Sequence, residues 1–315
     1  MPPLLRRILL APIPRLIWTL AIAFVLGWLL RRIAPSVMAY PNVAFAGAVR
    51  NAVLAFVVFA LGLWLFERKL PSQAGLAPWR AVPDTFRGFV IGAALLTAVT
   101  GLLALAGSYR ILGWAVLPEG TSRAYLFGKM TLMFLAVGIF EELVSRGIIF
   151  RQLEQAIGTW LAMAISALLF GLGHRNNPGA TWVSSVAIAV EAGALLAAAY
   201  VATRSLWLPI GIHWAWNLFE GPVWGSLVSG NEIGVLARAS FPGPTFLTGG
   251  GFGPEAGLPA IVLGTALGVA FMVVAIRRNQ IVTPQWMHWV AGRLRGQGPE
   301  PVAPEPTPAV PPPTA

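Results

Sequence analysis

Residues 88–107, GFVIGAALLTAVTGLLALAG, form an apolar run without a single charged side chain. A helix needs roughly 20 mainly apolar residues to cross the hydrocarbon core of a bilayer. A second run of this kind, LPAIVLGTALGVAFMVVAI, occupies residues 258–276. An open sheet in lipid would leave backbone groups without hydrogen-bond partners, so both runs predict transmembrane helices.

The composition of the whole chain also predicts a membrane protein. Of the 315 residues, 57% are hydrophobic and 11% are charged, whereas about a quarter of the residues of a soluble domain are charged. This excludes disorder for most of the chain, because disorder goes with low hydrophobicity. The net charge of +10 does not indicate nucleic-acid binding, because arginines beside membrane spans are typical of cytoplasmic loops. The absence of cysteine excludes disulfides, thiolate metal sites and a cysteine nucleophile.

We therefore expect an all-α fold, a polytopic membrane bundle of about eight transmembrane helices. The first span ends at Arg31 and Arg32 rather than at a small-residue cleavage site, so we interpret it as a retained helix and not as a signal peptide. Residues 220–257 are rich in Gly and Pro, so they predict a long connection that covers or lines something. The predicted spans are residues 14–30, 51–66, 88–107, 126–145, 157–174, 181–203, 205–219 and 258–276.

The chain divides into four predicted segments. Residues 1–80 hold two transmembrane helices, and residues 81–280 hold the membrane core. An amphipathic basic segment follows in residues 281–295, where interfacial attachment explains His288. Residues 296–315 form a Pro-rich tail that we expect to be disordered. If the N-terminus is cytoplasmic, the cytoplasmic segments carry more basic residues than the outer segments. We therefore predict a multi-pass protein of the cell membrane with both termini cytoplasmic.

Ionisable side chains within apolar segments cost free energy, so each one needs a reason. The apolar run that begins at Thr131 ends in Glu141 and Glu142, and Arg146 follows. Glu142 and Arg146 are four residues apart, so they can pair on one helix face. That pairing would leave Glu141 free to point elsewhere. A helix end that reaches water with a surface ion pair is the alternative interpretation.

Two further polar motifs lie in later spans. Phe170 and His174 close one span, and His213 and Asn217 lie inside another. The four-residue spacing places His213 and Asn217 on one helix face, where both can donate hydrogen bonds to one small target. The alternatives are an interfacial His174 and a hydrogen bond between helices formed by the later pair.

Glu191 lies inside the apolar run VAIAVEAGALL. A functional carboxylate and a polar contact with a neighbouring helix both explain it, and we favour the structural role.

With straight helices, His174 and His213 would lie at different depths in the membrane. Tilted or broken helices, or other span boundaries, would remove this difference.

The three motifs, E-E-x-x-x-R, F-x-x-x-H and H-x-x-x-N, occur in this order on separate predicted spans. The combination resembles the CAAX protease and bacteriocin-processing family, also called the ABI family, which includes the type II CAAX prenyl endopeptidases. The resemblance covers roughly residues 80–280 and implies an intramembrane endopeptidase with eight or so helices. The matching positions are Glu141, Glu142, Arg146, Phe170, His174, His213 and Asn217.

Such an enzyme would hydrolyse peptide bonds of membrane-associated or lipidated peptides. Its expected partners are the lipid bilayer and a peptide or protein substrate at the membrane. In the mechanism that we prefer, Glu141 is the general base and His174 holds the attacking water. His213 and Asn217 donate hydrogen bonds to the developing oxyanion. The Glu142–Arg146 pair orients the site, and no cofactor is required.

A zinc-dependent mechanism is the alternative within this family, some members of which have been called metalloproteases. Catalytic zinc commonly has three protein ligands, and Glu141, His174 and His213 would supply them. However, the H-E-x-x-H motif is absent, and nothing in the sequence fixes a metal geometry.

Two other classes of function compete with a peptidase. A catalytically silent membrane scaffold or immunity protein would keep the fold without the chemistry. A proton-coupled transporter would use intramembrane Glu and His as proton relays. A transporter predicts repeated halves with matching broken helices, and the sequence shows no internal repeat.

Overall fold

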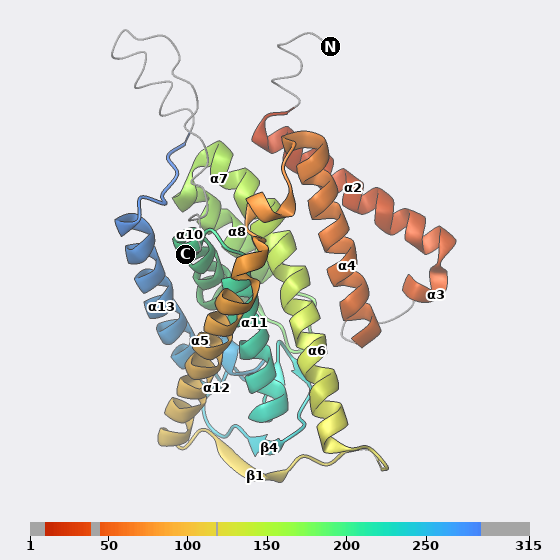
Figure 1. Cartoon of the computed structure of the whole chain (residues 1–315). Coiled ribbons are helices and arrows are strands. Elements are labelled where there is room, and N and C mark those ends of the chain that lie inside the picture. The colour runs from red at the N-terminus through yellow and green to blue at the C-terminus, as the bar shows by residue number, and fades with distance from the viewer. Residues whose placement is uncertain (1–9, 39–44, 118, 285–315) are drawn as a thin grey trace, which may run out of the picture.

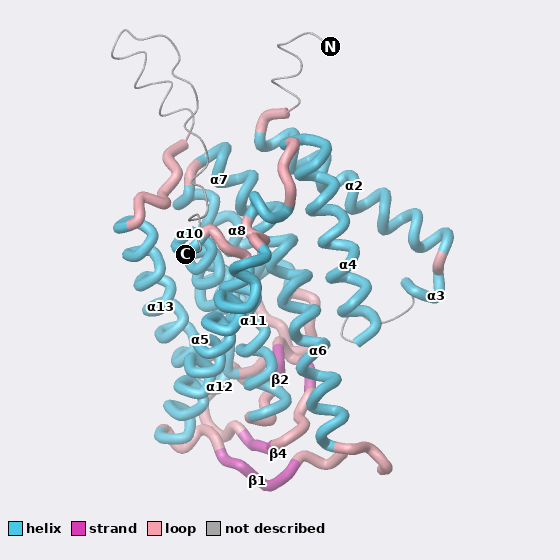
Figure 2. The backbone as a smooth tube through the Cα atoms, viewed as in Figure 1, coloured by secondary structure: helices cyan, strands magenta, loops and turns pink. Residues whose placement is uncertain are grey.

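The described part of the chain is a bundle of helices with two small sheets (Figure 1; Figure 2). This is a computed structural model, which describes residues 10–38, 45–117 and 119–284. The all-α membrane fold class is confirmed. The predicted Pro-rich tail, His288 and residues 285–295 of the amphipathic segment lie outside the described residues.

The N-terminal helices form one side of the bundle, and prolines mark several of their boundaries. Helix α2 has Pro12 at its first position, where no intrahelical hydrogen bond is lost. Helix α2 ends before Ala34, which precedes Pro35, because the residue before a proline disfavours helix. These elements are α2 (Pro12–Ile33), α3 (Pro35–Met38), α4 (Phe45–Gly62) and the π-helical turn η1 (Leu63–Glu67).

The remaining helices surround the centre of the molecule (Figure 1). Helices α6, η3 and α7 form one continuous run, as do α9, η4 and α10. The elements are η2 (Pro71–Ala74), α5 (Pro78–Leu105), α6 (Arg123–Glu142), η3 (Leu143–Phe150), α7 (Arg151–Ile157), α8 (Thr159–Gly173), α9 (Trp182–Ile188), η4 (Ala189–Ala194), α10 (Leu195–Thr203), α11 (Trp207–Leu218), η5 (Phe219–Val223), α12 (Thr245–Thr248), η6 (Pro254–Ala256) and α13 (Leu258–Arg277).

The structure contains two antiparallel strand pairs, of which the β1–β4 pair lies at the end of the bundle and the pair that contains β2 lies farther in, among the helices (Figure 2). Strand β1 (Arg110–Trp114) pairs with β4 (Ala237–Ser240), and β2 (Leu227–Val228) pairs with β3 (Asn231–Glu232). Three of these strands belong to the Gly- and Pro-rich connection that follows α11. This connection is therefore folded back onto the helices rather than extended into solvent.

Helices form at each of the eight predicted spans, but not all of them are long, uncharged membrane helices. Within the described residues, five segments are long and apolar enough to cross a membrane. The helix that contains Glu141 is charged at both ends, and α8 and α11 are short. The five long segments are Pro12–Ile33, Phe45–Glu67, Pro71–Leu105, Trp182–Thr203 and Leu258–Arg277.

Glycines bring α5 and α11 into backbone contact. A Cβ atom added to Gly92 would lie 2.3 Å from the carbonyl oxygen of Ile212, and one added to Gly88 would lie 2.2 Å from that of Leu208. The contact is reciprocal, because a Cβ on Gly211 would lie 2.2 Å from the Thr85 carbonyl oxygen. Small residues allow membrane helices to approach in this way. The contact fixes α11, which carries His213 and Asn217.

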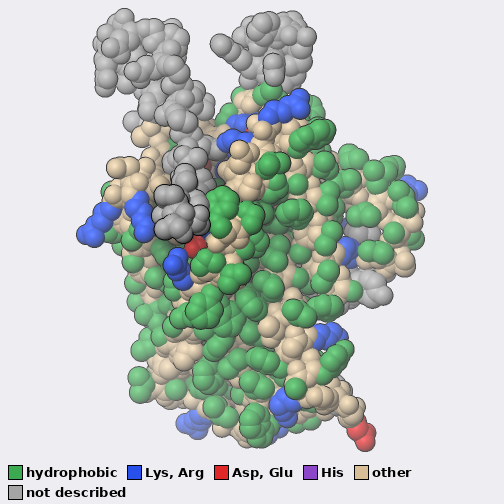
Figure 3. Space-filling model, viewed as in Figure 1, with side chains coloured by type: hydrophobic (Ala, Val, Ile, Leu, Met, Phe, Trp, Pro, Cys, Tyr) green, Lys and Arg blue, Asp and Glu red, His purple; other side chains and the backbone are tan. Residues whose placement is uncertain are grey.

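Buried ion pairs tie the other end of the bundle together. Arg151 donates to both carboxylate oxygens of Glu67 at 2.6 and 2.5 Å, which joins α7 to the end of η1. Arg204 donates to Glu154 at 2.5 Å, which joins the α10–α11 turn to α7. Between the two ends, the face in Figure 3 is largely covered by hydrophobic side chains, as expected for a surface in contact with lipid.

Candidate functional site

Glu142 and Arg146 form a buried ion pair where α6 widens into η3. Arg146 Nη1 donates to Glu142 Oε1 at 2.9 Å, and both side chains are 0% exposed. Arg146 Nη2 donates to the carbonyl oxygens of Ala192 and Gly193 at 3.2 and 2.8 Å. The guanidinium also lies 4.5 Å from the centre of the Phe170 ring. The pair that the spacing predicts therefore forms, and it connects α6 with α8 and η4.

His174 lies at the C-terminal end of α8, which has 15 residues. At 1.5 Å per residue this helix is about 22 Å long, shorter than the hydrocarbon core of roughly 30 Å. Helix α8 therefore ends within the bundle, and the chain turns at residues 174–181 into α9. This early end places His174 at the level of His213 and removes the difference in depth that straight, full-length spans would give.

Each imidazole of the site has one nitrogen held by a neighbour. His174 Nδ1 lies 2.9 Å from the carbonyl oxygen of Phe170. A carbonyl oxygen only accepts, so Nδ1 carries the hydrogen and donates it. His213 Nδ1 donates in the same way to Glu142 Oε1 at 3.0 Å. The Nε2 atom of each ring is left to face the interior.

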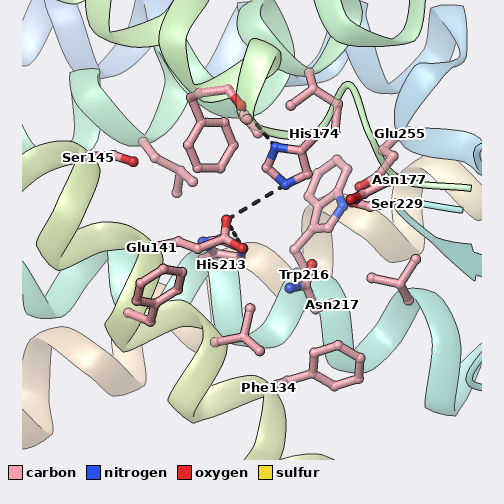
Figure 4. Close-up of a pocket in the computed structure, with 18 of the residues that line it drawn as sticks. Phe134, Glu141, Ser145, His174, Asn177, His213, Trp216, Asn217, Ser229 and Glu255 are labelled. Atoms are coloured by element: carbon pink, nitrogen blue, oxygen red, sulfur yellow. Dashed lines mark hydrogen bonds and ion pairs between the residues drawn. The ribbon is translucent and has the colours of Figure 1, made fainter. Parts of the chain in front are cut away.

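Glu141 lies between these two Nε2 atoms (Figure 4). Its Oε2 atom is 3.7 Å from His174 Nε2 and 3.8 Å from His213 Nε2. These separations exceed a direct hydrogen bond but lie within reach of a bridging water. Glu141 Oε2 is buried and accepts no hydrogen bond from any described residue. The structure thus brings the acid and both imidazoles together from α6, α8 and α11.

These side chains line a cavity of about 590 Å³. Asn217, one turn beyond His213 on α11, lines the same cavity. Apolar side chains such as Phe134 and Ile212 form part of its walls, which suits a mainly apolar ligand held by a few polar groups. The connection after α11 contributes Val228, Ser229, Asn231, Ile233 and Glu255.

Two carboxylates of this cavity were not assigned to the site from the sequence. Glu191, for which we favoured a structural role, lines the cavity with both carboxylate oxygens free of hydrogen bonds from described residues. Glu255 lies in the Gly- and Pro-rich connection, where no periodicity singles it out. The length of that connection, which indicates that it covers or lines something, was the available signal.

The donor set of the zinc alternative consists of Glu141, His174 and His213. Among the residues that the structure describes, no group of three or more His, Cys, Asp or Glu side chains is arranged to hold a metal ion. The zinc alternative stays a prediction, and the chemistry considered below uses the side chains themselves.

Residues 123–219 match the family model described as type II CAAX prenyl endopeptidase Rce1-like. This segment of the chain is similar to that family. The match confirms the resemblance to the CAAX protease and bacteriocin-processing family that the three motifs indicate. No curated protein and no solved structure matches the chain.

The matched segment begins with α6 and ends with the first residue of η5. It covers less than half of the chain, yet it contains every residue of the three motifs. Glu191 also lies within it, whereas Ser229 and Glu255 lie beyond its end. Together with the long apolar helices, the match supports a protease of the multi-pass membrane class.

Proposed function

We propose that this protein is an intramembrane endopeptidase that cleaves membrane-associated or lipidated peptides with a water activated by Glu141 and His174. The observation that carries the proposal is the 3.7 Å separation of Glu141 Oε2 and His174 Nε2. Since the hydrogen of His174 is on Nδ1, both facing atoms are acceptors. A water between them would donate one hydrogen to each and turn its lone pairs toward the cavity.

In the attack, the water oxygen bonds to the carbonyl carbon of the scissile peptide bond, and Glu141 takes the proton that the water loses. The electron pair of the C=O bond moves onto the carbonyl oxygen. When the tetrahedral intermediate collapses, the C–N bond breaks, and Glu141 returns the proton to the leaving amine. His174 keeps the water oriented throughout the attack.

His213 and Asn217 are placed to stabilise the oxyanion. The Asn217 amide donates without any change of charge. His213 donates from Nε2 only when its ring carries hydrogens on both nitrogens. The Glu142 carboxylate, 3.0 Å from Nδ1, is the counter-charge for that form. Loss of one good oxyanion donor lowers kcat by about 10²–10³-fold, so Asn217→Ala should lie in this range.

Cleavage is tested with purified protein in proteoliposomes that contain a library of lipidated peptides, with products mapped by mass spectrometry. Glu141→Gln should lower the rate by about 10²–10⁴-fold, because it removes the general base. The matched control is Glu232→Gln, which changes an exposed glutamate on β3 outside the cavity. Full proteolysis by the Glu141→Gln protein would overturn the proposal.

The same preparation separates the glutamate mechanism from the zinc mechanism. We expect active protein to contain less than one equivalent of zinc by elemental analysis and to keep its activity after exhaustive chelation. Activity that disappears on chelation and returns with zinc would instead assign Glu141, His174 and His213 as ligands.

Two further measurements address the competing functions. A silent scaffold or immunity protein would leave every library peptide intact. A proton-coupled transporter would move protons or solutes across the same proteoliposomes, and Glu141→Gln would stop that flux. We expect cleavage without flux.

A further inference from the structure

The cavity has a second polar region formed by two buried glutamates. Glu191 is 1% exposed and Glu255 is 3% exposed, and both line the same cavity as Glu141 and His174. The proposed mechanism uses neither of them. A buried carboxylate without a partner is costly, so both groups need an explanation.

Glu191 lies on η4, the π-helical segment between α9 and α10. Neither of its carboxylate oxygens accepts a hydrogen bond from any described residue. Gly264 of α13 packs against the backbone of Glu191, because a Cβ at that glycine would lie 2.9 Å from the Glu191 carbonyl oxygen. This close contact fixes η4 against α13, and the Glu191 side chain lines the cavity.

Glu255 lies against the turn between β2 and β3. Figure 4 shows Ser229 next to the Glu255 side chain, where Ser229 favours the ionised carboxyl. Ser229 has a positive φ of 46° and Gly230 one of 83°, a pair of conformations typical of a tight hairpin turn. The Oε1 atom of Glu255 accepts no hydrogen bond from the described residues.

A third buried carboxyl lies beside these two glutamates. Glu220 is 1% exposed and lies against the carboxyl of Glu255. Glu191 is close enough to both to interact with them electrostatically. Burial raises the pKa of Glu255 above its usual value. No ion pair joins a described Lys or Arg to any of the three, so these carboxyls have no resident counter-charge, and a cation brought by the substrate would favour their ionised form.

From this geometry we infer that Glu191 and Glu255 form a subsite that binds a positively charged group of the peptide substrate, a Lys or Arg side chain or a free α-amino group. The inference rests on the proposed function, because the cavity that holds both glutamates also holds Glu141 and His174. A metal ion explains the region less well, since the described residues form no group of three metal ligands. A cation that arrives with the substrate would compensate the charge of both carboxylates.

The subsite is tested with matched peptides that differ in one charged group. The best-cleaved library peptide is made with Lys, Arg, norleucine or Glu at each position near the scissile bond, and with a free or acetylated N-terminus. Wild-type protein should favour Lys or Arg over norleucine at one position, or the free over the acetylated terminus. We expect a ratio in kcat/KM of roughly 30-fold or more, as for a buried charge pair.

Glu191→Gln and Glu255→Gln should each reduce this ratio, and the double variant should bring it close to one. Glu232→Gln should leave the ratio at the wild-type value. Thermal unfolding of each variant checks that it is folded. A ratio that stays at the wild-type value in both single variants and the double variant would overturn the inference.

Binding provides a second readout that does not depend on cleavage. The Glu141→Gln protein in nanodiscs should bind the fluorescent Lys peptide more tightly than the norleucine peptide, and adding both Glu191→Gln and Glu255→Gln should abolish the difference. Cleavage without any preference for charge would count against the subsite alone. Absence of cleavage of every peptide would count against the proposed function, and equal binding of the two peptides would then reject the subsite as well.

Discussion

Arg146 combines three kinds of contact that a lysine could not make together. Its guanidinium pairs with Glu142, donates to two carbonyl oxygens of η4 and lies over the Phe170 ring. A planar guanidinium offers several donors in a fixed arrangement, whereas an ammonium is a point charge. Because Glu142 also accepts from His213, Arg146 influences the site through Glu142 rather than by touching the substrate.

A double-mutant cycle on Glu142 and Arg146 measures this role. Arg146→Met should lower the free energy of unfolding by about 3–5 kcal/mol, because it leaves the buried Glu142 without its counter-charge. Adding Glu142→Leu removes the second charge as well and should recover part of that loss. The measurement is reversible unfolding in mixed micelles. If the losses of the two single variants simply add in the double variant, the pair is not coupled.

Three π-helical segments occur next to the polar residues of the cavity. Segment η3 follows Glu142 directly, η4 contains Glu191, and η5 begins two residues after Asn217. Such widened turns are frequent at functional sites. In η4 the carbonyl oxygens of Ala192 and Gly193 accept the hydrogen bonds from Arg146. The irregular turns therefore place backbone acceptors and carboxylates that a regular helix would place elsewhere.

The α5–α11 contact offers a test with a control on the same helix. Gly92→Ala should lower the free energy of unfolding by about 1–3 kcal/mol, because its Cβ would meet the Ile212 carbonyl oxygen at 2.3 Å. We also expect slower cleavage, since α11 carries His213. In Gly101→Ala the added Cβ meets nothing within 4 Å, so that variant should keep wild-type stability. Equal stability of the two variants would contradict the importance of this contact.

The two ends of the molecule differ in their basic residues and in their loops. Arg68, Lys69 and Arg80 flank η2 toward one end, and the β1–β4 sheet lies at the other (Figure 2). The excess of basic residues predicts that the η2 end faces the cytoplasm. The β1–β4 sheet would then lie on the opposite side of the membrane.

This orientation can be tested directly because the chain contains no cysteine. A single cysteine at Glu119, between β1 and α6, should react with a membrane-impermeant maleimide in intact cells. A single cysteine at Ser72 in η2 should react only after the membrane is permeabilised. The inverse pattern of labelling would show that the topology is reversed.

The sequence was sufficient to predict the helical membrane fold and the residues that meet at Glu141. Apolar length predicts the spans, and four-residue spacing predicts the pairing of Glu142 with Arg146. The division of the chain at residue 80 and the catalytic roles stay predictions. The motifs were informative because the four-residue spacing in each predicts which two side chains share a helix face, a local property that needs no tertiary information.

The sequence did not predict the rest of the cavity for physical reasons. Glu255 and Ser229 reach it through a Gly- and Pro-rich connection, whose path depends on packing rather than on periodicity. The apolar sequence around Glu191 does not distinguish a side chain that contacts a neighbouring helix from one that faces a cavity. The level of His174 depends on where α8 ends, and apolar composition alone does not reveal that it stops short.

The brevity of α8 has a consequence for the surrounding lipid. Its outward side chains, including Leu161, Leu168 and Leu172, are about half exposed and apolar, yet the helix is about 8 Å shorter than a typical hydrocarbon core. A bilayer adapts to such hydrophobic mismatch by thinning beside the short helix. Lipid headgroups and water would then lie closer to His174, which shortens the distance that a hydrophilic peptide bond travels from water to the cavity. The protein would thus thin the bilayer beside α8, and its rate of peptide cleavage should fall as the acyl chains of the host bilayer are lengthened.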